Sequence, residues 1–149
     1  MAILTWEVAE QIDDNRILVE SEAAKVCAKL TTSSNKKNLH KKLLRIAKAS
    51  HDHDDIERVE ASQAFYEELF SVAKHHIAWE IVQRLNSRIS RLRALTLRSP
   101  ERQVAGFERM SRIYEAIEEN NAEQAKEAVK QHLSEAATLA KSILTAEEK

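Results

Sequence analysis

Only one glycine and one proline occur among the 149 residues of this chain. A domain of average composition would contain about ten glycines and about seven prolines at this length. Their scarcity leaves few residues suited to tight turns or to positive φ angles. It rules out nearly any all-β fold, whose hairpins depend on such residues, and it rules out the glycine-rich loops that bind nucleotide phosphates. The composition therefore favours an all-α fold.

The charge and cysteine content exclude further classes. Lys and Arg number 23 and Asp and Glu number 24, so the net charge of −1 argues neither for nor against nucleic acid. The single cysteine, Cys27, excludes a disulfide framework and a thiolate zinc cluster. The acidic N-terminal segment does not resemble a signal peptide, and no apolar run approaches the ~18 residues of a membrane span. We expect one cytoplasmic domain over residues 1–149, with its core over about 13–144.

Apolar residues recur at intervals of three and four along nearly the whole chain, which is the spacing of one helix face. Polar breaks at 31–35, 50–55, 74–76, 99–101 and 121–124 separate the helices. Ser99, Pro100 and Asn121 are residue types that favour helix starts. The pattern predicts an antiparallel bundle of about six helices. The inward stripe of the third helix begins at Val59, and that of the fourth begins at Ile81 and runs through Leu95.

Polar residues interrupt the inward apolar stripes at five places: Arg16, Ser62, Tyr66, Arg88 and His132. Helical bundles build ligand sites from inward side chains on facing helices. A buried arginine is costly without an anion, so Arg16 can pair with Glu20 one turn away or with a bound carboxylate. Each residue also has a structural interpretation, as an edge residue that reaches solvent or as a hydrogen-bonded core residue. Taken together, the five predict a polar pocket.

The remaining polar patterns favour no catalytic or metal-binding role. The run from His51 to Asp55 falls in a predicted loop, where acids favour the start of the next helix. The lysine-rich face of the second helix lacks interleaved aromatic residues for nucleic-acid stacking. Neither a Ser-His-Asp nor a Cys-His arrangement is recognisable, and no carboxylate falls clearly within an inward stripe. We therefore expect that the protein is not an enzyme.

Several segments carry a family pattern. The first helix reads R-x-x-V-E-x-x-A-A-K-V-C-A from Arg16, and the third reads S-x-x-F-Y-x-x-L from Ser62. The fourth contains R-I-S-R-L-R from Arg88, the fifth reads M-x-x-I-x-x-A-I from Met110, and the sixth contains H-L at His132. In this order they resemble the FCD domain, the C-terminal effector-binding domain of FadR-type GntR transcription regulators. The resemblance covers residues 13 to 144.

This resemblance implies a helical sensor of small metabolites, which are often carboxylates. Many members hold a divalent metal with one aspartate and three histidines, and those positions fall here on Ser62, Tyr66, Met110 and His132. Only the histidine is retained, and serine, tyrosine and methionine are poor ligands for such metals. We therefore expect no metal and no other cofactor, with the four side chains kept as part of the pocket wall.

The expected function is that of a non-enzymatic, ligand-sensing and dimerising domain. Its expected ligand is a small anionic metabolite such as a carboxylate, bound by Arg16, Ser62, Tyr66, Arg88, Met110 and His132. In the family, a winged helix that precedes the bundle binds DNA, so we expect no direct DNA contact by this chain. We also expect the chain to form a homodimer and not to contact a membrane. The alternative is a ligand-free interaction module that pairs with itself or with a full-length regulator.

Overall fold

The computed structural model describes residues 4–92 and 100–147, without the side chains of residues 100–105 and 147. Six helices fall within these ranges: α1 (Trp6–Leu30), α2 (Ser33–His51), α3 (Asp55–Ala73), α4 (His76–Arg88), α6 (Pro100–Glu118) and α7 (Ala122–Glu147). The described residues contain no strand. The predicted all-α bundle is therefore confirmed.

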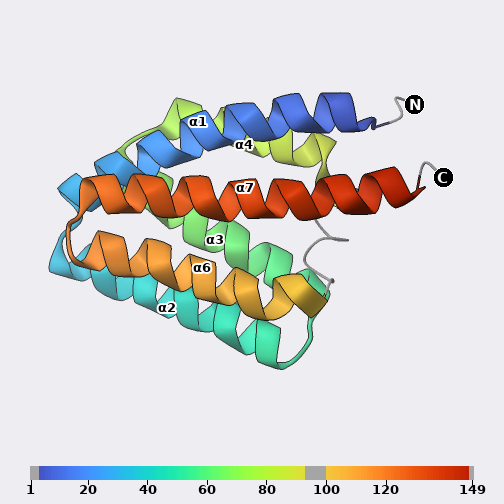
Figure 1. The fold of residues 1–149 in the computed structure, drawn as a ribbon. Helices are drawn as coiled ribbons and strands as arrows, with labels where there is room; N and C mark the ends of the chain where they lie inside the picture. The colour runs from blue at the N-terminus through green and yellow to red at the C-terminus, as the bar shows by residue number, and fades with distance from the viewer. Residues whose placement is uncertain (1–3, 93–99, 148–149) are drawn as a thin grey trace.

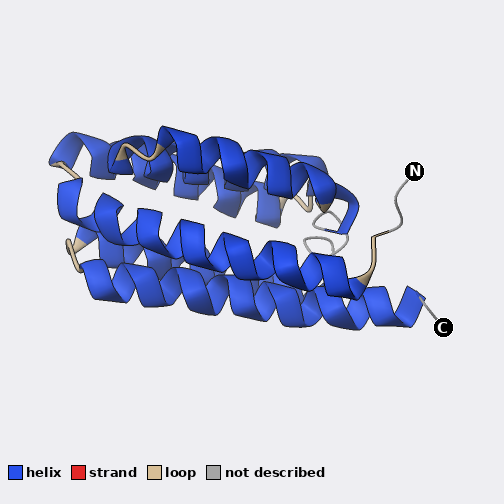
Figure 2. Ribbon diagram, turned by 90° about the horizontal axis from the view of Figure 1, so that it is seen from above, coloured by secondary structure: helices blue, strands red, loops and turns tan. Residues whose placement is uncertain are grey.

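The helices form an elongated antiparallel bundle in which the start of α1 and the end of α7 lie at the same end of the molecule (Figures 1 and 2). Helix α7 packs along α1 on one side and along α6 on the other. Helix α2 packs against α3 and α6, on the side of the bundle away from α1. Helix α4 lies at the periphery, against α1 and α3. Helices α1, α3, α6 and α7 thus surround the interior.

Helix ends follow the predicted polar breaks. Thr32 and Asn35 form a reciprocal capping box at the start of α2, and the backbone N–H of Gln124 donates to the side chain of Asn121 at 3.1 Å before α7. These contacts satisfy backbone N–H groups that have no partner within their own helix. The predicted cap at Ser99 lies outside the described residues.

Three connections use positive φ angles without glycine. His53, Lys74 and Asn120 have φ values of 52°, 61° and 55°. Asparagine tolerates this conformation well, and Asn120 also donates its Nδ2 to the carbonyl of Ala28 at 2.9 Å. A chain with a single glycine therefore makes its left-handed turns with other residues, one of which also ties the α6–α7 turn to α1.

The fourth helix is shorter than predicted. Helix α4 ends at Arg88, a turn follows at Ile89, and residues 90–92 are helical again. The predicted continuous helix to Leu95 is wrong at this turn, and residues 93–95 lie outside the described part of the chain. Ile89 is buried although it lies in the turn, so the apolar pattern continues through it. Apolar periodicity alone therefore does not reveal the turn.

Apolar packing forms two separate clusters. The larger cluster joins α1, α2, α3, α4, α6 and α7 and includes Phe65, Phe70 and Ile113. The smaller one lies near the chain ends and contains Ala9, Leu92, Ala140 and Leu144. The gap between the clusters on α1 contains the polar residues described next.

Candidate functional site

A buried polar layer separates the two apolar clusters along α1. Residues Asp13, Arg16 and Glu20 are all buried, between Ala9 of the smaller cluster and Ala23 of the larger one. Their spacing of three and four places them on one face of the helix. This layer is the strongest candidate for a functional site because burying charged side chains in a bundle is costly.

Arg16 forms two ion pairs within this layer. Its Nε lies 3.1 Å from Oε2 of Glu20, and its Nη1 lies 3.3 Å from Oδ1 of Asp13. The exposed fraction is 9% for the Arg16 side chain, 2% for Glu20 and 12% for Asp13. Burial by itself would lower the pKa of Arg16, but the two carboxylates outweigh it and the pKa lies above its ordinary value. The guanidinium is therefore permanently charged.

Other predicted site residues lie on the helices that pack against α1. Tyr66 of α3 is buried and close enough to Arg16 to affect its pKa electrostatically. His132 is buried on α7, the helix that packs most extensively against α1, and Met110 is buried on α6. Ser62 of α3 is half-buried. The predicted inward positions of Arg16, Tyr66, Met110 and His132 are confirmed.

Arg88 does not belong to this interior. Its side chain is exposed, so its predicted inward position is wrong. The predicted stripe on α4 began at Ile81, whereas the structure buries Val82 and leaves Ile81 47% exposed. Because the buried seam is shifted by one residue, about 100° around the helix, Arg88 lies on the solvent side.

Two carboxylates of the site were missed by the sequence reasoning. The expectation that no carboxylate lies in an inward stripe is wrong, because Asp13 and Glu20 are both buried. Their signal was present, since positions 13, 16 and 20 follow the same spacing as the apolar stripe of α1. From the sequence, Glu20 is interpreted only as a possible partner for Arg16. A charged residue at a stripe position indicates burial when an opposite charge lies one turn away on the same face.

Two further arginines form ion pairs outside this layer; Arg58 is buried and Arg109 is half-buried. Arg58 of α3 pairs with Asp55, and Arg109 of α6 pairs with Glu135 of α7. In Arg58, Nε and Nη1 have no hydrogen-bond partner within the described part of the chain. The burial of Arg58 was missed in the sequence analysis, because apolar periodicity placed its neighbour Val59 on the inward stripe.

Comparison with known proteins places these observations in a family. The sequence profile of the FCD domain matches residues 11–135. The chain belongs to the FCD domain family. FCD domains are in general the effector-sensing domains of GntR-type transcription regulators, so the resemblance inferred from the sequence is confirmed.

Two solved structures share the fold of this FCD domain. One is Lar, which controls the expression of the Listeria monocytogenes agr system and mediates virulence; it is 18% identical, with a TM-score of 0.79 over 93% of this chain. The other is E. coli McbR/YncC, 15% identical, with a TM-score of 0.77 over 93% of this chain. The chain spans 65% of the length of Lar and 68% of McbR/YncC. No curated protein sequence matches the chain closely.

The family's divalent metal does not fit the residues present. The corresponding positions in this FCD domain hold Ser62, Tyr66, Met110 and His132, of which only histidine is a good ligand. Within the described ranges, no three His, Cys, Asp or Glu side chains come together in a metal-binding arrangement.

Proposed function

We propose that this FCD domain senses a small carboxylate-bearing metabolite in its interior, without a metal. The buried layer of Arg16, Asp13 and Glu20 is the observation that carries the proposal. An arginine that stays charged inside a bundle offers a planar, bidentate donor for a carboxylate. Tyr66 and His132 lie on facing helices and supply further polar groups for a ligand, while Ser62 and Met110 are further candidates for the pocket wall.

The two ion pairs of Arg16 suggest where the effector would enter. Asp13 makes the longer contact and is the more exposed of the two carboxylates, whereas Glu20 is almost wholly buried. An effector carboxylate would therefore replace Asp13 on Nη1 and leave the Glu20 pair intact. Asp13 would then turn toward solvent, where an ionised carboxylate is readily hydrated. Because Arg88 is exposed, we assign it no contact with an interior ligand.

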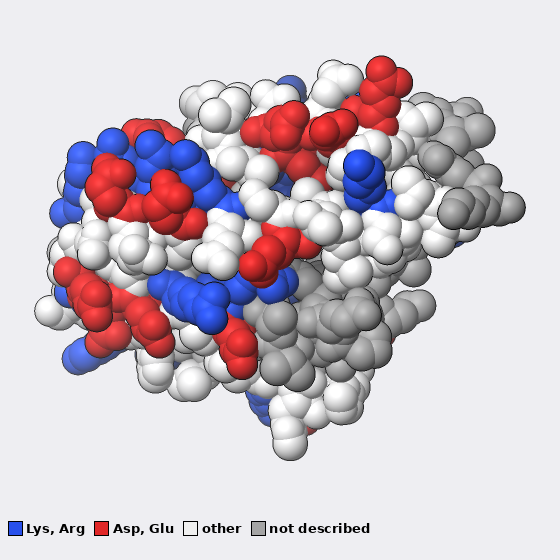
Figure 3. All heavy atoms as spheres, in the orientation of Figure 1, with Lys and Arg blue, Asp and Glu red and all other residues white. Residues whose placement is uncertain are grey.

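We further propose that the domain is a cytoplasmic, non-enzymatic homodimer that does not bind DNA directly. Leu18 of α1 and Ile77 and Ile81 of α4 are exposed apolar side chains on two helices that contact each other, which supports pairing through this face. Acidic and basic side chains lie interleaved on the face in Figure 3, an arrangement unlike a phosphate-binding surface. None of the described helices is long and apolar enough to cross a membrane.

One observation favours the ligand-free alternative. Glu20 and Asp13 together more than offset the single positive charge of Arg16, so the empty protein does not need an anion to neutralise it. In that case the layer would only fix the register of α1 inside the bundle, as buried polar pairs do in some helical proteins. The two functions differ in whether any carboxylate binds.

A thermal-shift screen tests the proposal. The purified domain is heated with a panel of mono-, di- and tricarboxylates, with the corresponding amides as neutral controls, and with zinc, nickel and manganese salts. A ligand that binds the folded state raises the melting temperature by mass action. We expect a carboxylate to raise it and its amide not to, with no stabilisation by the metals. If no carboxylate raises the melting temperature, the ligand-free module is the correct function; near-stoichiometric metal lost on changing His132 would contradict the metal-free site.

A further inference from the structure

Helix α2 carries an outward row of basic side chains. Lysine and arginine occupy six of its 19 positions, and aspartate and glutamate occupy none. At 100° per residue, four exposed side chains fall within an arc of about 60°, on the side of the helix opposite its buried residues. These four are three lysines and one apolar residue that is 53% exposed, and we call them the basic stripe: Lys37, Lys41, Leu44 and Lys48.

The neighbouring helices contact α2 on either side of the basic stripe and leave it uncovered. Toward α3, Arg45 donates to both carboxylate oxygens of Glu57 at 2.8 Å. Toward α6, the ring of His40 lies 5.4 Å from that of Tyr114. The stripe runs between these two contacts, and its lysines make no ion pair within the described part of the chain. Its positive charge is therefore available to a partner.

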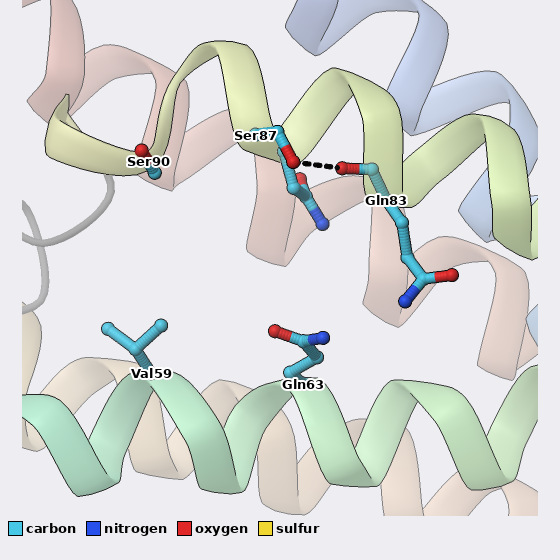
Figure 4. A pocket seen from close by; sticks show the side chains of 6 residues that line it. Val59, Gln63, Gln83, Ser87 and Ser90 are labelled. Atoms are coloured by element: carbon cyan, nitrogen blue, oxygen red, sulfur yellow. Dashed lines mark hydrogen bonds between the residues drawn. The ribbon is translucent and has the colours of Figure 1, made fainter.

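The sign of the surface charge changes where the stripe ends. Helix α3 borders two clefts, and Figure 4 shows the smaller one, toward α4, where Ser87 donates to the backbone carbonyl of Gln83. The other cleft, of about 450 Å³, lies at the corner between α2 and α3. It is lined by Lys48, the last residue of the stripe, by Ala49, by the 75% exposed Ile56, and by four acids that we call the acidic corner: Asp52, Asp54, Glu57 and Glu60.

This change of sign restricts the kind of partner. A nucleic acid or an anionic membrane is negative along its whole length, so it would be attracted by the basic stripe and repelled by the acidic corner. A protein segment can carry both signs in the required order. Leu44 on the stripe and Ile56 at the corner offer an apolar contact on each half, as do the anchor residues in helix-binding surfaces.

We infer that this surface docks a helical segment of another protein, with acidic residues over the basic stripe and basic residues over the acidic corner. Lys37 and Lys48 are 11 residues apart, which corresponds to about 16 Å along α2 and to three turns of a partner helix. None of the residues that form this surface belongs to the interior layer around Arg16. The inference therefore does not depend on the carboxylate site proposed above.

Fluorescence anisotropy with a labelled peptide tests the inference. The probe is a helical peptide as long as α2, with glutamates in one half, lysines in the other and a leucine in each. A second peptide of the same composition has the two charges interleaved. We expect saturable binding of the first, weaker at high salt, and binding at least about fivefold weaker for the second, for a DNA duplex and for phosphatidylserine vesicles. No saturable binding of the first peptide would overturn the inference. Equal or tighter binding of the interleaved peptide, the duplex or the vesicles would also overturn it.

Matched charge reversals locate the binding surface. Lys41→Glu on the stripe and Glu60→Lys at the corner should each weaken binding at least about fivefold, because each replaces an attraction by a repulsion. Lys29→Glu and Glu22→Lys, at exposed positions on α1, make the same charge changes elsewhere and should leave the affinity unchanged. Equal losses in the α1 variants would contradict the assignment. A change of oligomeric state in Lys41→Glu would show that a second copy of the chain covers the stripe, which would also overturn the inference.

Discussion

Arg16 is the residue whose replacement should most disturb the empty protein. Arg16→Met removes the cation that lies against two buried carboxylates, and breaking a buried ion pair in this way costs about 3–5 kcal/mol. The double variant Arg16→Met/Glu20→Leu should recover most of that loss, since well-packed apolar residues often replace a buried pair without cost. Urea unfolding of both variants measures the effect. A single variant as stable as the native protein would show that the pair does not stabilise the fold.

Cys27 should be chemically inert while the protein is folded. It is fully buried, and burial, with a smaller effect of Glu68, raises the pKa of its thiol to about 12. The reactive thiolate is therefore scarce at pH 8. Because the pKa is higher in the folded state than in the unfolded chain, the neutral thiol's contribution to stability is complete below about pH 8.5 and is lost as the pH rises toward 12. Labelling with a thiol reagent should be slow at pH 8 and fast in denaturant; rapid labelling of the native protein would contradict this.

Arg58 should lower the free energy of unfolding of the native protein. Its side chain is 3% exposed, and two of its three guanidinium nitrogens have no hydrogen-bond partner within the described residues. Arg58→Met removes these donors, while Asp55 stays in the first turn of α3, where the helix dipole favours it. We expect the free energy of unfolding to rise by about 1 kcal/mol. Arg45→Met is the control, because Arg45 donates to both oxygens of Glu57 at 2.8 Å and its loss should lower stability. A destabilised Arg58→Met variant would show that the Arg58–Asp55 pair outweighs the two unsatisfied nitrogens, and would contradict this prediction.

At the scale of the helices, the sequence predicted most of the architecture. The breaks at 31–35, 50–55 and 74–76 contain helix ends. The side chains of Thr32 and Asp54 accept hydrogen bonds from backbone N–H groups at the first two breaks, whereas no side chain caps the start of α4 at His75. The inward face of α4 was misassigned because this peripheral helix packs only on α1 and α3 among the described elements, so apolar residues occur on more than one side of it. Apolar periodicity shows that a segment is helical more reliably than it shows which face of a partly exposed helix is buried.

A pair of alanine substitutions tests the phase of α4. Val82 is fully buried, so Val82→Ala should cost about 2 kcal/mol through lost burial and the cavity left behind. The neighbouring Ile81→Ala removes more atoms, but its side chain is 47% exposed, so the cost should be smaller. Unfolding in urea compares the two. A larger loss of stability in Ile81→Ala than in Val82→Ala would support the inward stripe predicted from the sequence and contradict the buried face seen in the structure.

For the whole molecule, the sequence predicted individual site residues better than the way they pair. The inward positions of Arg16, Tyr66 and His132 followed from helical periodicity. The burial of Asp13 and its contact with Arg16 were missed, although positions 13, 16 and 20 share the spacing of the apolar stripe of α1.

The central proposal is that an interior effector binds Arg16 by replacing Asp13. Calorimetric titration tests it, using the carboxylate that raises the melting temperature most in the thermal-shift screen. Asp13→Asn removes the competing charge from Nη1 and should tighten binding by at least about fivefold, a typical size for coupling between sites. The Arg16→Met/Glu20→Leu variant, which keeps an apolar interior, should lose measurable binding. Binding of native strength by the double variant would contradict the account, as would weaker binding by Asp13→Asn.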